Sequence, residues 1–480
     1  MPKAAGPAPL RVVFAASELA PLAQTGGLGD AVAGLAAALA ARGHRVTCLL
    51  PAYASALAHP ACPALEPGRG ARIETGDGAL VGRWLAGRLG AVAVELLELG
   101  GLFGGGALYG GADEGRRFAA FARAAAARAA EGGADALVAH DWQAALAICV
   151  LRTLYDRGDA RGIGTLQAVH NAAHQGLCPV GTLGVTGLPR ELFAPDGLEF
   201  HGSLSLLKGG LVWADRIVAV SPSYAREIQT PAGGGGLEGL YAYRAHRLVG
   251  IANGIDAERY DPARDAALAA RFDAEDPAGR AQCRKALVEE LGLETPEAGW
   301  LLACVGRLAL QKGWDVLAEA APRLVEEGAG LALLGDGDAA LAARFERLAA
   351  RWPRRIRLRG GWDEGLARRL YAGADAVLVP SRFEPCGLVQ LLAQRYGALP
   401  VAHRVGGLRD TIRDGQTGVL FEPLSADALV AAARRGASLV RRGGSALVRR
   451  LLGLDLSWAR PAGLWERELS RACEEAAARI

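Results

Sequence analysis

The fold is decided by residues 12–42, which read VVFAASELAPLAQTGGLGDAVAGLAAALAAR. The apolar run at residues 12–16 predicts a short buried strand, and the alanine- and leucine-rich run at residues 31–42 predicts a helix. A glycine turn at residues 24–30 separates them. Because the first turn of a helix has unpaired N–H groups and the positive end of the helix dipole, such a turn can hold a phosphate.

The succession of strand and helix continues along the chain. Short apolar runs separated by amphipathic segments indicate a parallel sheet covered by helices on both faces. The expected strands are residues 12–16, 45–50, 92–97, 136–139, 165–169 and 216–220, and then 301–305, 331–334, 356–358, 376–379, 400–402 and 419–421. The predicted fold class is therefore α/β, with two Rossmann-like doubly wound domains and a cleft between them.

The chain has 480 residues, which is more than one ordinary core requires. We expect an N-terminal Rossmann-like domain over residues 1–252, a second Rossmann-like domain over residues 253–458, and a terminal helix over residues 459–480 that packs back towards the first domain. The polar, irregular stretch at residues 261–277 is expected to carry the crossing between the domains.

Composition argues against several classes of protein. The formal net charge is only +3 and the arginines are scattered, so a nucleic-acid partner is not expected. No run of about 20 apolar residues is present, so no membrane segment is expected. The eight cysteines show no C-x-x-C pairing and are interpreted as reduced, which favours a cytoplasmic protein.

Only four of the 54 basic residues are lysines. A lysine that persists inside a motif indicates a position where a compact ammonium is needed instead of a planar guanidinium. Lys208 and Lys312 are the two lysines that stand inside such motifs.

Polar residues follow the expected strands at their carboxyl ends, where ligands bind in open α/β sheets. His140, Asp141 and Trp142 follow one strand of the first domain, and His170 and Asn171 follow another. Asp141 and Trp142 can position an acceptor, although an aspartate after a strand is also a common helix cap. A histidine at a strand end is often structural, and the neighbouring Asn171 favours a functional role for His170.

The second domain carries three charged candidates. Arg307 and Lys312 are five residues apart across a strand-to-helix turn, so both can reach one diphosphate with hydrogen bonds worth roughly 1.5–3 kcal/mol each. Glu384 lies in the turn Phe383-Glu384-Pro385-Cys386-Gly387, where a carboxylate can accept sugar hydroxyls. Each assignment has a structural alternative. Arg307 and Lys312 are then solvated basic residues at a helix start, and Glu384 stabilises the dipole of the helix that follows it.

In their order along the chain, these motifs resemble the bacterial glycogen synthase and plant starch synthase family, whose members are retaining glucosyltransferases that use ADP-glucose. The resembling blocks are residues 17–18, 25–28, 140–142, 170–171, 197–200, 207–208, 221–228, 253–256, 307–308, 311–313 and 380–388. The resemblance implies a GT-B fold, a nucleotide-sugar donor held mainly by the second domain, and an α-glucan acceptor on the first. It also implies that one glucose is added to the end of an α-1,4-linked chain. No metal or other cofactor is expected, because ADP-glucose is a substrate.

The resemblance also implies roles for individual residues. The catalytic residues would be Glu384, His170, Asp141, Arg307 and Lys312. The donor would be bound by Gln24, Gly26, Gly27, Asn253, Arg307, Lys312, Cys386, Gly387 and Leu388. The acceptor would be bound by Asp141, Trp142 and Asn171.

One position departs from the family pattern. Members normally have lysine before Thr-Gly-Gly-Leu, and this chain has Gln24 there. Loss of an ammonium beside a diphosphate costs on the order of 1.5–3 kcal/mol. Three hypotheses remain open: an active ADP-glucose-dependent glucan synthase, a related GT-B transferase with another nucleotide donor, and a weakly active glucan-binding regulatory protein.

Overall fold

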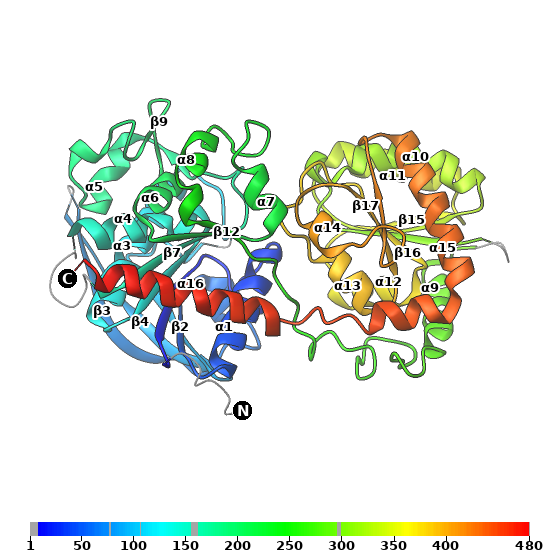
Figure 1. The fold of residues 1–480 in the computed structure, drawn as a ribbon, viewed down its shortest axis with the longest axis horizontal. Helices are drawn as coiled ribbons and strands as arrows, with labels where there is room; N and C mark the ends of the chain where they lie inside the picture. The colour runs from blue at the N-terminus through cyan, green and yellow to red at the C-terminus, as the bar shows by residue number, and fades with distance from the viewer. Residues whose placement is uncertain (1–7, 76–77, 106, 155–161, 295–298, 480) are drawn as a thin grey trace. The chain divides into compact units, whose positions relative to one another are not determined.

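The computed structural model describes residues 8–75, 78–105, 107–154, 162–294 and 299–479. The chain divides into two compact units (Figure 1). Unit 1 comprises Met1–Gly254 and Trp458–Ile480, and unit 2 comprises Ile255–Ser457. Asn253 therefore belongs to unit 1. The chain crosses between the units after Gly254 and again after Ser457, so the expectation of a crossing within residues 261–277 was wrong: Phe272 from that stretch is buried in the core of unit 2.

Unit 1 is built on a nine-stranded sheet of order β12-β11-β7-β6-β1-β2-β5-β4-β3. Its strands in that order are Leu248–Gly250, Arg216–Ala219, Gly164–Val169, Ala136–His140, Arg11–Ala15, Arg45–Pro51, Val92–Leu99, Gly78–Leu89 and Glu66–Thr75. Pairing is parallel from β12 to β5 and antiparallel for β4 and β3. Every residue of β6, β7 and β11 is buried, as expected for parallel strands covered on both faces.

Helices cover this sheet in two layers. Helices α3, α4 and α6 pack side by side, and α1 packs against α16. The helices of unit 1 are α1 (Gly27–Ala41), α2 (Ala54–Leu57), α3 (Glu114–Glu131), α4 (Asp141–Leu154), α5 (Leu183–Thr186), α6 (Leu206–Trp213), α7 (Pro222–Glu227), α8 (Glu238–Tyr243) and α16 (Ala459–Ala477), with short 3₁₀ turns η2 (Val180–Thr182), η3 (Arg190–Leu192) and η4 (Ala245–Arg247).

Two further pieces of unit 1 do not follow the parallel pattern. The strands β3 and β4 form a long antiparallel hairpin at the edge of the sheet. A separate three-stranded sheet has the order β8-β10-β9, formed by Leu177–Cys178, Ser203–Ser205 and Glu199–Phe200. Sequence analysis predicted neither of these two pieces.

Unit 2 has a six-stranded parallel sheet of order β15-β14-β13-β16-β17-β18. Its strands in that order are Ile356–Arg359, Gly330–Leu334, Leu301–Val305, Ala376–Val379, Leu399–His403 and Val419–Phe421. Its helices are α9 (Gly279–Leu291), α10 (Trp314–Glu326), α11 (Ala339–Arg351), α12 (Glu364–Gly373), α13 (Val389–Arg395), α14 (Gly406–Thr411) and α15 (Ala426–Leu452), with the 3₁₀ turn η5 (Leu310–Lys312).

The side chains of β13 alternate between two hydrophobic cores of unit 2. Leu302 and Cys304 pack with α10, α11 and α15, whereas Leu301, Ala303 and Val305 pack with α9, α12 and α13. Because successive side chains of a strand point to opposite faces, helices must cover both faces of this sheet. Unit 2 is thus the doubly wound domain that the sequence predicts.

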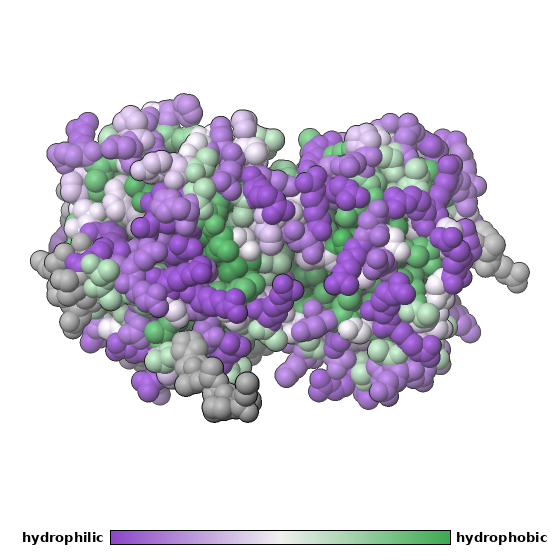
Figure 2. All heavy atoms as spheres, viewed as in Figure 1, coloured by the Kyte–Doolittle hydropathy of each residue, from purple (hydrophilic) through white to green (hydrophobic). Residues whose placement is uncertain are grey.

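Helix α16 returns the chain to unit 1, where it packs against β7 and α1 (Figure 1). It buries Trp465, Leu469, Ala472 and Ala476 along one side. The surface over α16 is mainly hydrophilic (Figure 2). The helix is therefore amphipathic, and its apolar side completes the core of unit 1.

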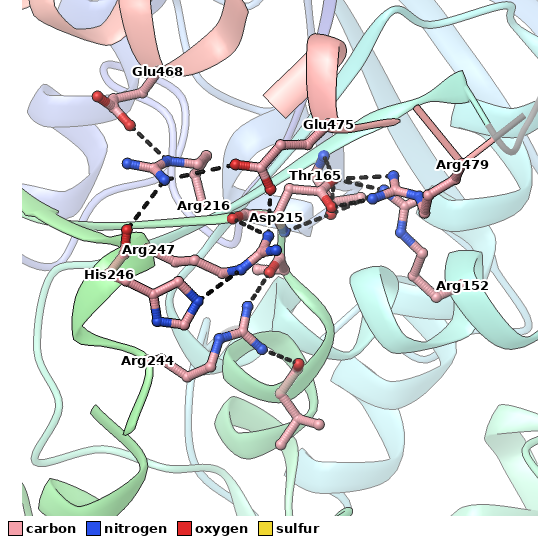
Figure 3. A network of polar contacts seen from close by, with 12 residues as sticks. Arg152, Thr165, Asp215, Arg216, Arg244, His246, Arg247, Glu468, Glu475 and Arg479 are labelled. Atoms are coloured by element: carbon pink, nitrogen blue, oxygen red, sulfur yellow. Dashed lines mark hydrogen bonds and ion pairs between the residues drawn. The ribbon is translucent and has the colours of Figure 1, made fainter. Parts of the chain in front are cut away.

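A network of ion pairs fixes α16 at the amino ends of β7 and β11 (Figure 3). Asp215 accepts hydrogen bonds from Arg152 at 2.6 Å, from the backbone N–H of Thr165 at 2.8 Å and from Arg479 of the C-terminal segment. Burial alone would raise the pKa of Asp215, but Arg479 and Arg152 hold it below its ordinary value. Arg216 donates to Glu468 at 2.7 Å, which ties β11 to α16.

Among the described residues, no helix combines the length and the apolar character needed to cross a membrane.

Candidate functional site

The carboxyl ends of three neighbouring strands gather the candidate residues of unit 1. Strand β6 lies between β1 and β7, with parallel pairing on both sides. Glu18 follows β1, Asp141 follows β6 and His170 follows β7. The structure therefore brings Asp141, His170 and Asn171 together at the edge of the sheet where ligands bind.

Asp141 fixes the turn after β7. It is one of the described non-glycine residues with a left-handed backbone, at φ 53°, and it is buried. Its Oδ1 accepts hydrogen bonds from the backbone N–H groups of His170 at 2.6 Å and Asn171 at 3.2 Å. Burial raises the pKa of Asp141 to about 7, although these two hydrogen bonds oppose the shift. Asp141 thus holds His170 and Asn171 in register at the sheet edge.

His140 and His170 form a ring-to-ring hydrogen bond of 3.0 Å between Nδ1 of His140 and Nε2 of His170. Burial lowers the pKa of both imidazoles, that of His170 to about 3, so both are neutral at pH 7. Nε2 of His140 is buried and has no partner within the part of the chain that the structure describes. We assign the proton of His140 to Nδ1, because an orphaned buried N–H is costlier than an orphaned lone pair. His170 then keeps its own proton on Nδ1.

A second polar cluster orders the glycine turn, and sequence analysis missed its main contact. Glu18 accepts hydrogen bonds from the backbone N–H of Thr25 at 2.9 Å and from its Oγ1 at 2.8 Å. The hydroxyl of Tyr109 donates to Glu18 at 2.6 Å. Ser17 and Glu18 stand in the motif that carries the resemblance, but no sequence pattern links them to a tyrosine about ninety positions away.

Gln24 has its own partners in unit 1. Its side-chain amide donates to Oδ2 of Asp30 at 2.5 Å and to the carbonyl of Gly26 at 3.0 Å. Asp30 lies in the first turn of α1, which begins at Gly27 after the extended Gly26. The glutamine therefore braces the turn from Gly26 to Asp30, and a lysine at this position would face the same carboxylate.

The remaining candidates of unit 1 differ in exposure. Trp142 is buried and its ring packs edge-on against Phe118, with ring centroids 5.1 Å apart. Asn171 caps its own turn by accepting from the N–H of Ala173 at 3.1 Å. Asn253 is half-buried in the segment that leads from β12 to unit 2. Trp142 thus shapes the site from the core side.

In unit 2, Lys312 and Glu384 form the central pair. Nζ of Lys312 lies 2.7 Å from Oε2 of Glu384, and the hydroxyl of Ser381 donates to the same oxygen at 2.8 Å. Glu384 is buried, and its Oε1 has no hydrogen bond from the residues that the structure describes. The pair presents an ammonium beside a carboxylate oxygen that can still accept a sugar hydroxyl.

Arg307 lies at the carboxyl end of β13 and is exposed. Its guanidinium makes one long contact, 3.5 Å to Oε1 of Gln311, and no ion pair to any other described residue. A solvated guanidinium of this kind can turn towards an anion with little cost. Arg307 and Lys312 therefore supply two cations at one strand end.

Backbone packing fixes the turn that carries Glu384. Gly387 has φ 75°, and a Cβ atom there would lie 2.3 Å from the side-chain oxygen of Gln390. That side chain donates to the carbonyls of Cys386 at 3.0 Å and Gly387 at 2.7 Å. A Cβ on Gly407 would lie 2.3 Å from the carbonyl of Cys386. The turn through Cys386, Gly387 and Leu388 is thus held tightly against its neighbours.

Trp362 is a candidate that sequence analysis missed. It follows β15 at the same edge of the sheet as Arg307 and Glu384, and it is 69% exposed. Two strand spacings separate β15 from β13, about 10 Å. The sequence signal for Trp362 was its place just after the expected strand at residues 356–358, at the sheet edge where ligands bind.

Comparison with known proteins defines the class. Residues 11–243 match the family described as starch synthase catalytic domain, and residues 300–438 match glycosyl transferases group 1. A solved structure described as the catalytic domain of starch synthase IV from Arabidopsis thaliana bound to ADP and acarbose has a TM-score of 0.90 at 30% identity, covering 97% of this chain and 100% of that one. Sucrose-phosphate synthase from Thermosynechococcus elongatus shares the fold, with a TM-score of 0.63 at 20% identity, covering 96% of this chain and 100% of that one. The protein is a GT-B glycosyltransferase, as predicted.

Curated relatives narrow the assignment. A glycogen synthase from Anaeromyxobacter dehalogenans is 43% identical over 477 residues, which is 95% of this chain and 98% of the relative. A glycogen synthase from Thermus thermophilus is 42% identical over 468 residues, which is 96% of this chain and 99% of the relative. The chain belongs to the glycogen synthase and starch synthase family.

Proposed function

We propose that this protein transfers glucose from ADP-glucose to the non-reducing end of an α-1,4-glucan, with retention of configuration. The observation that carries the proposal is the triad of Lys312, Glu384 and Arg307 at the strand ends of unit 2. It combines two cations for a diphosphate with a buried carboxylate for a sugar. The similar starch synthase IV was solved bound to ADP and acarbose, which supports a nucleoside diphosphate and a sugar as the ligands of this protein.

On the donor side, Lys312 and Arg307 neutralise the diphosphate and stabilise the charge that grows on it as the glycosidic bond breaks. Glu384, oriented by Ser381, accepts hydroxyls of the transferred glucose. Trp362 follows β15, which lies about 10 Å from β13 in the sheet, and its exposed ring offers a flat surface on which the base of the donor stacks. The ribose then spans the distance between the ring and the cations.

On the acceptor side, unit 1 holds the glucan at the carboxyl ends of β6 and β7. With the tautomer assigned above, the Nδ1–H of His170 is a donor that remains neutral at pH 7. A neutral donor beside the reacting carbon stabilises a departing oxygen without adding a charge. The departing phosphate takes the proton of the attacking hydroxyl, so the retained configuration needs no protein nucleophile. We further propose that no resident metal or cofactor takes part.

A donor panel tests the proposal. Purified protein is incubated with glycogen and with ADP-, UDP- or GDP-glucose, and both the released nucleotide and the incorporated glucose are measured. We expect equal amounts of ADP and incorporated glucose, and much slower turnover of the other donors. No transfer from ADP-glucose, under conditions where a Thermus thermophilus glycogen synthase is active, would reject the proposal.

Gln24 favours a second candidate, a GT-B transferase for another nucleotide sugar. The family pattern has a lysine at this position, and Gln24 is engaged with Asp30. In the same panel, a preference for UDP- or GDP-glucose would support this second candidate. Negligible turnover of all three donors, combined with tight glycogen binding, would instead support a regulatory glucan-binding protein.

A further inference from the structure

A cavity of about 350 Å³ lies in unit 1 outside the site described above. Its walls come from the loop before β9, from β9, from α6 and from α8, which lie near one another in Figure 1. Gly236, one of its lining residues, follows Gly235, whose carbonyl accepts a hydrogen bond from Gln175 at 2.5 Å. The cavity is therefore next to the loop that begins at Asn171, on the acceptor unit.

Lys208 provides the buried polar group of this cavity. Only 7% of the residue is exposed, and its ammonium donates to the carbonyls of Pro195 and Glu199 at 2.6 Å each. An ammonium has three protons, so one remains for a further acceptor. Lys208 is also one of the four lysines of this arginine-rich chain. The donor site accounts for Lys312, and nothing in the transfer reaction accounts for Lys208.

The charges around the cavity select the class of ligand. Asp196 and Glu199 both line it, and both act on the ammonium of Lys208. Two carboxylates and one ammonium leave an excess of negative charge, which disfavours phosphates and other anions. Carboxylates accept hydrogen bonds and the ammonium donates one. Such a set matches a neutral ligand with many hydroxyl groups.

Aromatic side chains complete the surface. Phe200 and His201 line the cavity with their rings edge to face, 4.6 Å between centroids. Gly239 and Leu240 of α8 also line it, and Tyr243 lies one helical turn further on the same face of α8. Tyr243 is 79% exposed. Flat apolar rings beside hydrogen-bonding groups suit the apolar faces and the hydroxyls of a sugar ring.

We propose that the cavity at Lys208 is a second glucan-binding site, which holds one glucose unit of the polymer away from the point of transfer. Asp196, Glu199 and Lys208 bind its hydroxyls, and Phe200, His201 and Tyr243 pack against its ring faces. The choice of an α-glucan as the ligand rests on the proposed function. The site raises the affinity for long or branched acceptors by adding a second attachment to one polymer.

The test compares a double variant, Asp196→Asn with Phe200→Leu, and the single variant Tyr243→Ala with the parent protein. Val81→Ala is the matched control, because Val81 is a 58% exposed apolar residue of the same unit outside the cavity. Glycogen affinity is measured by electrophoresis in gels that contain glycogen, and transfer rates are measured with glycogen and with maltotriose. Thermal unfolding checks that each variant is folded.

We expect the double variant to bind glycogen about tenfold more weakly and its KM for glycogen to rise about tenfold. Tyr243→Ala should show a smaller change in the same direction. The kcat with glycogen and the rates with maltotriose should stay at the parental values, and Val81→Ala should match the parent throughout. Tyr243→Ala remains informative if the double variant fails to fold, because its side chain is almost fully exposed.

Unchanged glycogen retention in the folded variants would overturn the proposal. An equal loss with maltotriose and with glycogen would also overturn it, because the residues would then belong to the transfer site. Gel retention needs no catalysis, so this result is independent of the donor panel. A protein that binds glycogen through this cavity but transfers no glucose would reject the proposed function and keep the second site.

Discussion

At the scale of single residues, the donor site that we propose depends on the ammonium of Lys312. It lies 2.7 Å from Glu384 and is placed by η5 at the end of β13. Arginine dominates the basic residues of this chain, and a lysine at this position presents a compact ammonium with three rotatable donors instead of a planar fork. Lys312 contacts the carboxylate of Glu384, and in the function that we propose it also binds the leaving diphosphate.

We predict that Lys312→Ala lowers kcat/KM for the nucleotide sugar by about 10- to 100-fold, since it removes a charge-assisted bond worth roughly 1.5–3 kcal/mol. Lys285→Ala is the control, because Lys285 has an 80% exposed side chain and only a long contact with Glu289. Initial rates at several donor concentrations measure the effect. A parental rate in Lys312→Ala would contradict the assigned role.

Gln24→Lys is predicted to change activity only a few-fold. The new ammonium would face the carboxylate that Gln24 now contacts, that of Asp30, so part of its charge is neutralised. The measurement is kcat/KM for ADP-glucose beside that of the parent, with Gln24→Met as a control for side-chain length. A rise from negligible activity by a factor of 100 or more would show that the parent site is impaired.

Asp141 gives a prediction about pH. Its pKa is raised from 3.8 to about 7, so its contribution to stability is present at low pH and is lost as the pH rises through 7. The pKa of His170 is lowered to about 3, so its contribution has the opposite sign: it is present above pH 6.5 and is lost as the pH falls. The two contributions oppose each other between pH 4 and 6.5.

Asp141→Asn removes only the first contribution. Relative to the parent, the free energy of unfolding of the variant should rise from pH 4 to pH 7 by on the order of 4 kcal/mol and then level off. Urea unfolding at several pH values measures this difference. A difference between variant and parent that does not depend on pH would show that Asp141 has an ordinary pKa.

At the scale of elements, the C-terminal helix is held by buried charges rather than by apolar packing alone. Asp215 joins Arg152 and Arg479 at the amino ends of the strands, the opposite edge from the site (Figure 3). Leaving the buried guanidinium of Arg152 without its carboxylate is costly. The network should therefore affect stability and leave catalysis unchanged.

Asp215→Asn is predicted to lower the free energy of unfolding by about 3 kcal/mol, with KM values unchanged. Glu131→Gln is the matched control, because it removes an exposed ion pair with Arg69 and should cost less than about 1 kcal/mol. Urea unfolding followed by circular dichroism measures both variants. Equal stability of the two would contradict a structural role for the buried network.

The sequence predicted the parallel strands of both units to within two residues, with the exception of β12, because short apolar runs between helical segments are typical of buried strands. It missed β12, which has only three residues, none of them fully buried. It missed the hairpin of β3 and β4, since only Ile73 is buried in β3 and no alternation of apolar residues marks this edge strand. The contact between Lys312 and Glu384 could be anticipated from motifs at neighbouring strand ends. The contacts of Tyr109 with Glu18 and of His140 with His170 could not, because they depend on loop geometry and ring orientation.

At the scale of the whole molecule, the function that we propose divides the chemistry between the two units. Unit 1 presents neutral imidazoles and hydrogen-bonding groups suited to a glucan, and unit 2 presents cations suited to a nucleotide diphosphate. The division explains why the charged donor residues are concentrated in one sequence half. The separate role in acceptor binding that we propose for Lys208 places this lysine in unit 1, away from the proposed donor residues.

A crystal structure of the protein with ADP tests the central claim most directly. We predict that phosphate oxygens of ADP lie within hydrogen-bond distance of Nζ of Lys312 and of the guanidinium of Arg307, and that the base stacks on Trp362. A diphosphate bound elsewhere, with Lys312 and Arg307 free of contact with it, would contradict the account.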